Sequence, residues 1–352
     1  MTAGPAGSLL DVLVIGSGQA GLAMGYHLAQ SGRTFQIVDA SAEIGGTWRS
    51  RWDSLLLFTS GRYDSLPGLP FPAAPDTYPG KDDVASYLQA YAAEFKLPVR
   101  LNTKVTSLTR SAGGYVAKAG GEALEARQVV VATGPFQVPF TPPIADALGP
   151  GVHQIHSAHY RHPQSVPPGK VLVVGAANSG CQIAQELSAT HRVELSVGQR
   201  LPAISQRPLG RDIWAWATAL RLDKVTADSR LGKRLAGRDQ VIGPGPRRLA
   251  RRHGIRIRPR AASADGRTVT FADGSAADFD TVVWATGYRP DHSWIDIPEA
   301  KDGQGHILHQ RGVTSSPGLY MLGLTWQYTR GSALLGWVGN DAAFLAGQIA
   351  RR

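Results

Sequence analysis

Two glycine-rich turns, each placed directly after an apolar run, constrain the fold of this chain more than any other feature. The first lies in DVLVIGSGQAGLAM and the second in VLVVGAANSGCQIAQEL. A strand, a glycine turn, a helix and a second strand form a βαβ unit, and such units build a parallel sheet covered by helices. The sequence therefore predicts an α/β protein with two dinucleotide-binding, Rossmann-like domains.

The first turn has the residues that a bound dinucleotide requires. Gly16 permits the tight turn, Gly18 lets the backbone approach a pyrophosphate, and Gly21 allows the helix to pack closely on the strand. Asp39 ends the next predicted strand, where a carboxylate accepts hydrogen bonds from ribose hydroxyls. We expect a dinucleotide to be bound by Gly16, Gly18, Gln19, Ala20, Gly21 and Asp39.

The second turn, GAANSG, departs from this pattern at its centre, where Ala177 replaces the middle glycine. We expect Gly175, Ala177, Asn178, Ser179 and Gly180 to bind a nicotinamide dinucleotide at the helix start. The matching strand end, VELSVGQR, has Gly198 and Arg200 where a ribose-binding acid normally stands. An arginine there binds a 2′-phosphate and so favours NADPH over NADH, although NADH remains an acceptable cofactor. The alternative is that Arg200 is an ordinary surface arginine.

Two dinucleotide sites imply two cofactors. The economical pair is a tightly held flavin, FAD, and a transient hydride donor, NADPH.

Composition excludes several other classes of protein. Cys181 is the only cysteine, so the chain can form neither an internal disulfide nor a redox pair; this favours a cytoplasmic location, with Cys181 as a small buried side chain. No apolar run is long enough for a membrane span, and the N-terminus lacks the features of a signal peptide.

The formal net charge of +10 is concentrated in RRLARRHGIRIRPR, from Arg247 to Arg260. No aromatic residues interleave with these arginines as stacking platforms, so we expect a solvated face and neither a nucleic-acid nor a membrane partner.

Three further segments, EIGGTWRSRW, VVVATGP and VVWATGYRPD, resemble the flavin-containing and Baeyer-Villiger monooxygenases, especially their short bacterial members. The resemblance implies an FAD-binding domain, residues 1–160 and 288–352, interrupted by an NAD(P)H-binding domain, residues 161–287, with a helical insertion at about residues 200–250.

The resemblance also implies positions for the flavin. The expected contacts are Gly46, Thr47, Trp48, the backbone of Val105 at a strand end, Ala132, Thr133, Gly134, and Ser332 and Ala333 at a helix start facing the flavin pyrimidine ring. Phe58, Thr59 and Ser60 occupy a segment where many members place an asparagine near the flavin. Trp48 and Phe58 as plain core residues are the alternatives.

The family's linker signature is only partly present. His156 and Tyr160 keep their mutual spacing, but Gly151 is one position too far from His156. His156 and Tyr160 are therefore expected either to position the domains or cofactors or to be structural.

The implied reaction is transfer of hydride from NADPH to the flavin, addition of O2 at flavin C4a, and transfer of one oxygen atom from the resulting hydroperoxide to a small apolar thioether, amine or ketone. No protein nucleophile or metal is required. Aromatic residues at the domain junction, Trp214, Trp216, Trp326, Tyr328 and Trp337, are expected either to line a substrate pocket or to pack helices. A flavin reductase or oxidase without oxygen insertion, a non-catalytic basic flavoprotein and a homodimer remain open.

Overall fold

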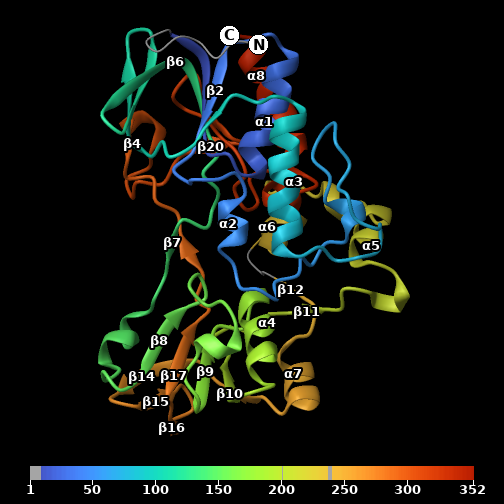
Figure 1. The fold of residues 1–352 in the computed structure, drawn as a ribbon, viewed down its shortest axis with the longest axis vertical. Coiled ribbons are helices and arrows are strands. Elements are labelled where there is room, and N and C mark those ends of the chain that lie inside the picture. Colours follow the sequence, from blue (N-terminus) through green and yellow to red (C-terminus); the bar gives the residue numbers. More distant parts are fainter. Residues whose placement is uncertain (1–8, 200, 237–239) are drawn as a thin grey trace.

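The computed structural model describes residues 9–199, 201–236 and 240–352. It has two lobes, one above the other in Figure 1, and β7 (Val138–Pro139) lies between them. The C-terminal end of the chain lies at the top of the first lobe (Figure 1). Each lobe contains a parallel sheet, as the two βαβ patterns predict.

The parallel part of the first sheet has the strand order β3-β2-β1-β6-β22. Its strands are β1 (Leu10–Ile15), β2 (Phe35–Val38), β3 (Val99–Arg100), β6 (Glu122–Val131) and β22 (Leu319–Met321). Val12, Leu13 and Val14 of β1 are completely buried. Helices cover the sheet, so its central strands are apolar on both faces, which explains the continuous apolar run before the first glycine turn.

An antiparallel extension continues the first sheet through the other half of β6. It contains β4 (Val105–Ser111) and β5 (Gly114–Ala119), and the short β19 (Ile295–Asp296) adds a parallel partner to β4. β20 (His309–Gln310) and β21 (Val313–Thr314) lead into β22. The turns that join β4 to β5 and β5 to β6 contain the glycine pairs Gly113-Gly114 and Gly120-Gly121, which are typical of hairpin turns.

Helices α1 (Gln19–Gln30), α3 (Lys81–Glu94) and α8 (Val338–Ala350) belong to the first lobe, and α1 packs against α8 (Figure 1). The short α2 (Gly46–Arg49) contacts α3. No helix in the described residues is both long and apolar enough to cross a membrane.

The sheet of the second lobe is entirely parallel, with the order β13-β10-β9-β17-β8. Its strands are β8 (His153–His156), β9 (Lys170–Val174), β10 (Arg192–Ser196), β13 (Arg256–Arg258) and β17 (Thr281–Trp284). Helices α4 (Asn178–Leu187) and α7 (Pro246–His253) pack together beside this sheet. A three-stranded antiparallel sheet follows, with β14 (Ala261–Asp265), β15 (Thr268–Phe271) and β16 (Ala276–Asp278).

The segment between β10 and α7, which we call the insertion, is less helical than expected. It contains α5 (Ile213–Ala219), α6 (Arg230–Ala236) and a parallel pair of strands, β11 (Ala203–Ile204) and β12 (Val241–Ile242). The insertion extends to the first lobe. There the Ala227 N–H donates to the Tyr328 carbonyl (2.7 Å), and Thr226 forms an isolated antiparallel β-bridge with Thr329.

The chain passes between the lobes twice. The two passages pair as antiparallel strands, β7 with β18 (Tyr288–Arg289). β8 pairs with β17, so the second sheet includes residues 153–156, which precede the domain boundary expected at residue 161.

Candidate functional site

The first glycine turn joins β1 to α1. Gly16 has φ +110°, and a Cβ atom at this position would lie 2.5 Å from the Ala132 carbonyl oxygen. A Cβ on Gly21 would overlap the Gly16 carbonyl oxygen, so both positions require glycine because the backbones are in contact. Gly18 is different, because no atom lies within 4 Å of its Cβ position. The turn therefore leaves open space at the helix start, which fits a pyrophosphate.

Asp39 closes this turn from the end of β2. Its Oδ2 accepts hydrogen bonds from the Ser17 backbone N–H (2.5 Å) and hydroxyl (2.8 Å), and its Oδ1 accepts from the Ser41 N–H (2.8 Å). The carboxylate thus lies beside the glycine turn, where a ribose would follow the pyrophosphate.

Gln19, the first residue of α1, brings two distant segments to the same place. Its Oε1 accepts from the indole N–H of Trp48 (3.2 Å), and its Nε2 donates to the Ala333 carbonyl (3.0 Å). Ala132 and Thr133 lie against Gly16, and Gln137 donates to both the Thr133 hydroxyl and the Gly134 carbonyl (2.8 Å each). Residues expected from four separate parts of the sequence therefore meet at the start of α1, which also includes the buried Ala20.

Two expectations about local structure are wrong. Val105 begins β4 rather than ending a strand, because the preceding segment leaves the sheet, where the Thr103 N–H donates to the Asp39 carbonyl (2.7 Å). Ser332 and Ala333 do not start the last helix. They lie in a separate 3₁₀ turn, Arg330–Ala333, because Leu334 is extended (ψ 147°), and α8 begins only at Val338. The Ser332 hydroxyl accepts from the N–H groups of Tyr328 and Thr329.

The second glycine turn has the same geometry as the first. A Cβ on Gly175 would overlap the Ala285 carbonyl oxygen, and one on Gly180 would overlap that of Gly175. Ala177 has φ −78° and ψ −173°, close to the −70° and −175° of Gly18. The middle position thus needs no left-handed backbone, which explains why alanine is accepted there.

The helix start of α4 is also tied to the insertion. Asn178 Oδ1 accepts from the Ile242 N–H (2.9 Å), and Ser179 follows it in the first turn of the helix. One edge of the second glycine turn is therefore formed by β12 of the insertion.

Arg200 lies outside the described residues. The structure places another arginine, Arg260, beside the segment that follows β10. Ser196 pairs with Arg258 across the parallel strands, and two residues further the Arg260 side chain lies over Gly198, 3.6 Å from its Cβ position. Arg260 is exposed. Within the described residues its side chain has no hydrogen-bond or ion-pair partner. We missed Arg260 because only the pairing of β13 with β10 places it beside Gly198.

His156 and Tyr160 both have structural partners. Tyr160 is completely buried, and its hydroxyl donates to Glu186 of α4 (2.8 Å). His156 Nδ1 accepts from the Ala158 N–H (3.1 Å), so Nε2 carries the proton and donates to the Gly287 carbonyl (3.1 Å). Burial lowers the pKa of His156, so the ring stays neutral. These contacts fasten the second lobe to the passage at β18.

Thr59 and Ser60 lie in a buried turn that ends at Asp64. The Thr59 hydroxyl donates to Asp64 Oδ1 (2.5 Å). Asp64 and Ser60 are completely buried, and neither Asp64 Oδ2 nor the Ser60 hydroxyl has a partner among the described residues. Burial raises the pKa of Asp64 to about 7, against the effect of the Thr59 hydrogen bond, and the nearby Asp212 carboxylate raises it further.

Aromatic side chains from both lobes meet beside this turn. The Trp214 ring of α5 lies 4.8 Å from Trp337 and 6.3 Å from Phe58, measured between centroids, and Trp337 also stacks on Tyr63 (5.8 Å). We call these four residues the junction cluster. The ring contacts agree with the packing alternative, since Trp214 packs the insertion against the first lobe; a substrate pocket at this place stays a prediction.

The other aromatic residues proposed for a pocket lie outside this cluster. The half-buried Trp216 donates to the Pro208 carbonyl (3.1 Å), and the Tyr328 ring lies against the Arg311 guanidinium (3.9 Å). Trp326 is half-buried in a left-handed backbone conformation (φ 55°).

Cys181 lies on the buried side of α4. Its thiol donates to the Ala176 carbonyl (3.4 Å), and burial raises its pKa to about 12. The expectation of an inert buried thiol is confirmed. With no second cysteine in the chain, dithiol chemistry is excluded.

Comparison with known proteins assigns this arrangement to a family. The model of the pyridine nucleotide-disulphide oxidoreductase family matches residues 13–214, from β1 to α5. The chain belongs to this family. An oxidoreductase of Geobacillus kaustophilus (strain HTA426), described as uncharacterized and CzcO-like, is 46% identical over 342 residues, which are 97% of this chain and 98% of that protein.

Solved structures refine the assignment. A flavin-containing monooxygenase from Stenotrophomonas maltophilia is 29% identical and superposes with a TM-score of 0.81 over 98% of this chain and 99% of that one. OTEMO in complex with FAD and NADP, 18% identical, shares the fold with a TM-score of 0.70 over 97% of this chain and 84% of that one. The resemblance to flavin monooxygenases is confirmed, and the protein is a flavin-dependent oxidoreductase.

Proposed function

We propose that this protein is an FAD-dependent, NADPH-using monooxygenase that inserts one oxygen atom from O2 into a small organic thioether, amine or ketone. The observation that carries the proposal is the pair of glycine turns with matching backbone geometry, one in each lobe, connected by the paired passages β7 and β18. Two such sites suit a resident flavin and an exchanging hydride donor.

In this proposal the first lobe binds FAD. The pyrophosphate lies at the start of α1 against Gly16, Gly18 and Gly21, and Asp39 accepts from the ribose. Gln19, Trp48 and Ala333 form one hydrogen-bonded group at the same helix start, which places α2 and the 3₁₀ turn along the flavin. Val105 then lies towards the adenine, since its segment follows Thr103, which is bonded to Asp39.

The second lobe binds NADPH at Gly175, Ala177 and Gly180 of the turn and at the start of α4. Arg260, beside Gly198 at the end of β10, contacts the 2′-phosphate; Arg200, outside the described residues, stays a prediction from the sequence. We place the beginning of this lobe at β8 rather than at residue 161, because β8 is part of its sheet.

FAD held there would supply the redox chemistry, the acceptance of hydride from NADPH and the activation of O2. The residues of the chain bind and orient the cofactors and exclude water. The junction cluster, with the buried Trp214 and the half-buried Phe58 and Trp337, provides an apolar approach for the substrate at the meeting of the two lobes. The single buried cysteine agrees with a cytoplasmic location.

A substrate panel tests the proposal. The FAD-loaded protein is given thioethers, amines and ketones, and the oxygenated product, the NADPH consumed and the hydrogen peroxide released are measured together. We expect at least one class to yield product in a ratio to NADPH near unity. Stoichiometric hydrogen peroxide with every substrate would instead identify an NAD(P)H oxidase, and the monooxygenase assignment would fail.

A further inference from the structure

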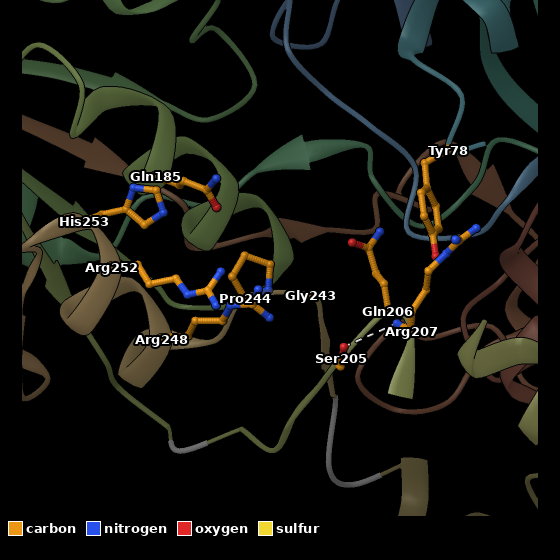
Figure 2. A pocket seen from close by; sticks show the side chains of 10 residues that line it. All are labelled: Tyr78, Gln185, Ser205, Gln206, Arg207, Gly243, Pro244, Arg248, Arg252 and His253. Atoms are coloured by element: carbon orange, nitrogen blue, oxygen red, sulfur yellow. Dashed lines mark hydrogen bonds between the residues drawn. The ribbon is translucent and has the colours of Figure 1, made fainter. Parts of the chain in front are cut away.

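A basic cavity of about 300 Å³ lies where the insertion meets α4 and α7 (Figure 2). One side is formed by α4 and α7 of the second lobe, and the other by the insertion and a loop of the first lobe. It is lined by Tyr78, Gln185, Ser205, Gln206, Arg207, Gly243, Pro244, Arg248, Arg252 and His253.

The cavity is strongly positive. Three of its lining residues are arginines, and no aspartate or glutamate lines it within the part of the chain that the structure describes. Arg248 and Arg252 are one helical turn apart on α7, so they share a face. Like charges at this spacing destabilise a helix. Neither guanidinium has a hydrogen-bond or ion-pair partner among the described residues. The two charges are therefore available to a ligand.

The opposite wall is held in place by contacts between the lobes. The Arg207 guanidinium lies 5.7 Å from the centre of the Tyr78 ring, donates to the Asp76 carbonyl (2.6 Å) and is 3.8 Å from the Asp76 carboxylate. The Tyr78 hydroxyl donates to Asp212 (3.3 Å). The charge of Arg207 is thus partly neutralised, while Ser205 and Gln206 add neutral hydrogen-bonding groups on this side (Figure 2).

The remaining arginines of α7 do not line the cavity. Arg251 Nε donates to the Arg247 carbonyl on another part of the helix surface. The basic segment noted in the sequence therefore divides into a pair that lines the cavity, Arg248 and Arg252, and a pair that does not, Arg247 and Arg251.

The cavity is distinct from the second glycine turn. It touches α4 at Gln185, in the last turn of the helix, whereas the glycine turn precedes the first turn at Asn178. The two places are nevertheless linked, because Gly243 in the cavity wall follows Ile242, whose N–H donates to Asn178.

We propose that this cavity is a second anion-binding site, which takes a small phosphate-bearing molecule independently of NADPH. Guanidinium groups match phosphate oxygens with paired, charge-assisted hydrogen bonds. The volume suits a phosphorylated molecule much smaller than a dinucleotide, and the link from Gly243 to Asn178 gives an occupant a route to influence the nucleotide turn. The proposal concerns a separate site and does not depend on oxygen transfer.

Calorimetric titration of the FAD-loaded full-length protein with inorganic pyrophosphate tests this site, in the presence of saturating NADP⁺. The test variant is Arg248→Ser/Arg252→Ser. The matched control is Arg247→Ser/Arg251→Ser, which removes the same charge from the same helix outside the cavity. We expect the test variant to weaken pyrophosphate binding by about tenfold or more and the control by less than about twofold, since each lost contact is charge-assisted.

Three results would overturn the proposal. Equal weakening in the two double variants would show a diffuse effect of net charge, and no binding to the wild type at millimolar pyrophosphate would show no site. Loss of pyrophosphate binding when NADP⁺ is added would assign the anion to the nucleotide site. Thermal unfolding of all three proteins establishes that the variants are folded.

Discussion

Arg260 is the residue whose position was least apparent from the sequence. It follows β13, and it reaches the nucleotide edge only because β13 lies parallel to β10. Its side chain covers Gly198, where a glycine leaves room and no carboxylate competes for the charge. A 2′-phosphate would therefore lie beside an arginine, whereas the 2′-hydroxyl of NADH would gain little from it.

We predict that Arg260→Ala raises the dissociation constant of NADPH by roughly tenfold, the loss of one charge-assisted contact, and changes that of NADH by less than about twofold. Calorimetry with 2′,5′-ADP and 5′-ADP measures the same contrast without turnover. Arg256→Ala is the matched control, an exposed arginine at the start of the same strand. If Arg260→Ala weakens both nucleotides equally, the residue does not read the 2′-phosphate.

Asp64 contributes a pH-dependent term to stability. Its pKa in the folded protein is about 7, against 3.8 as the reference value. Between about pH 4 and 7 the unfolded chain loses this proton while the folded protein keeps it, so the free energy of unfolding falls as the pH rises through this window. The upper limit of the effect is about 4 kcal/mol, from a shift of roughly three pKa units.

We predict that Asp64→Asn removes this dependence, because the amide cannot ionise and its oxygen still accepts from the Thr59 hydroxyl. Thermal melts of the wild type should lose stability relative to Asp64→Asn between pH 5 and pH 8. Asp228→Asn, at an exposed position, should follow the wild type at every pH. Parallel curves for the wild type and Asp64→Asn would show that Asp64 titrates normally.

At the scale of elements, the insertion depends on the other lobe for its order. Trp214 of α5 is 4% exposed, and its ring contacts Trp337 and Phe58. The Arg330 guanidinium lies 5.5 Å from the centre of the same ring. Helix α5 has only seven residues, so packing rather than intrinsic propensity stabilises it.

We predict that Trp214→Ala releases the insertion from the first lobe. Truncation of a buried tryptophan costs about 3 to 5 kcal/mol, which loosens the insertion although hydrogen bonds such as that from Ala227 to Tyr328 remain. Limited trypsin digestion should then cleave within residues 201–236 many times faster than in the wild type. Trp216→Ala, at a half-buried ring on the same helix, should leave the cleavage rate nearly unchanged. Equal cleavage of the two variants would contradict this role for Trp214.

Sequence reasoning succeeded for elements whose signals are local. The glycine turns, α1 and the hairpins at the glycine pairs follow from spacing and from the residues that tight turns require. It failed where a distant contact decides the structure. Ser332 and Ala333 looked like the start of the last helix, but the capping of Tyr328 and Thr329 by the Ser332 hydroxyl makes a separate turn. The short strands β11 and β12 exist because they pair with one another across the insertion.

The two lobes were predictable from the repeated βαβ pattern, and the passages between them were implied by the resemblance to flavin monooxygenases, but the junction was not predictable. Trp214 meets Phe58 and Trp337 only because the insertion reaches the first lobe. Such contacts depend on how the lobes are placed, which no local pattern specifies.

At the scale of the whole molecule, the net charge of +10 sets the approach of an anionic cofactor. A positive protein attracts NADPH over distances set by the screening length, which falls from about 30 Å at 0.01 M salt to about 10 Å at 0.1 M. We predict that the second-order rate of flavin reduction by limiting NADPH, followed by stopped-flow absorbance, falls several-fold over this range. NADH, which lacks the 2′-phosphate, should show a shallower slope.

The two slopes separate a long-range field from a local contact. Arg260→Ala removes one charge of a net +10, so its NADPH rate should keep most of the wild-type salt dependence even where its affinity is reduced. A field summed over many residues persists when one is lost, whereas a contact does not. If the salt dependence disappears in Arg260→Ala, the attraction is local to the end of β10. If the salt dependence is absent from the wild type as well, the net charge does not guide the cofactor. The protein's excess of arginine then serves another purpose, such as the basic cavity beside α7.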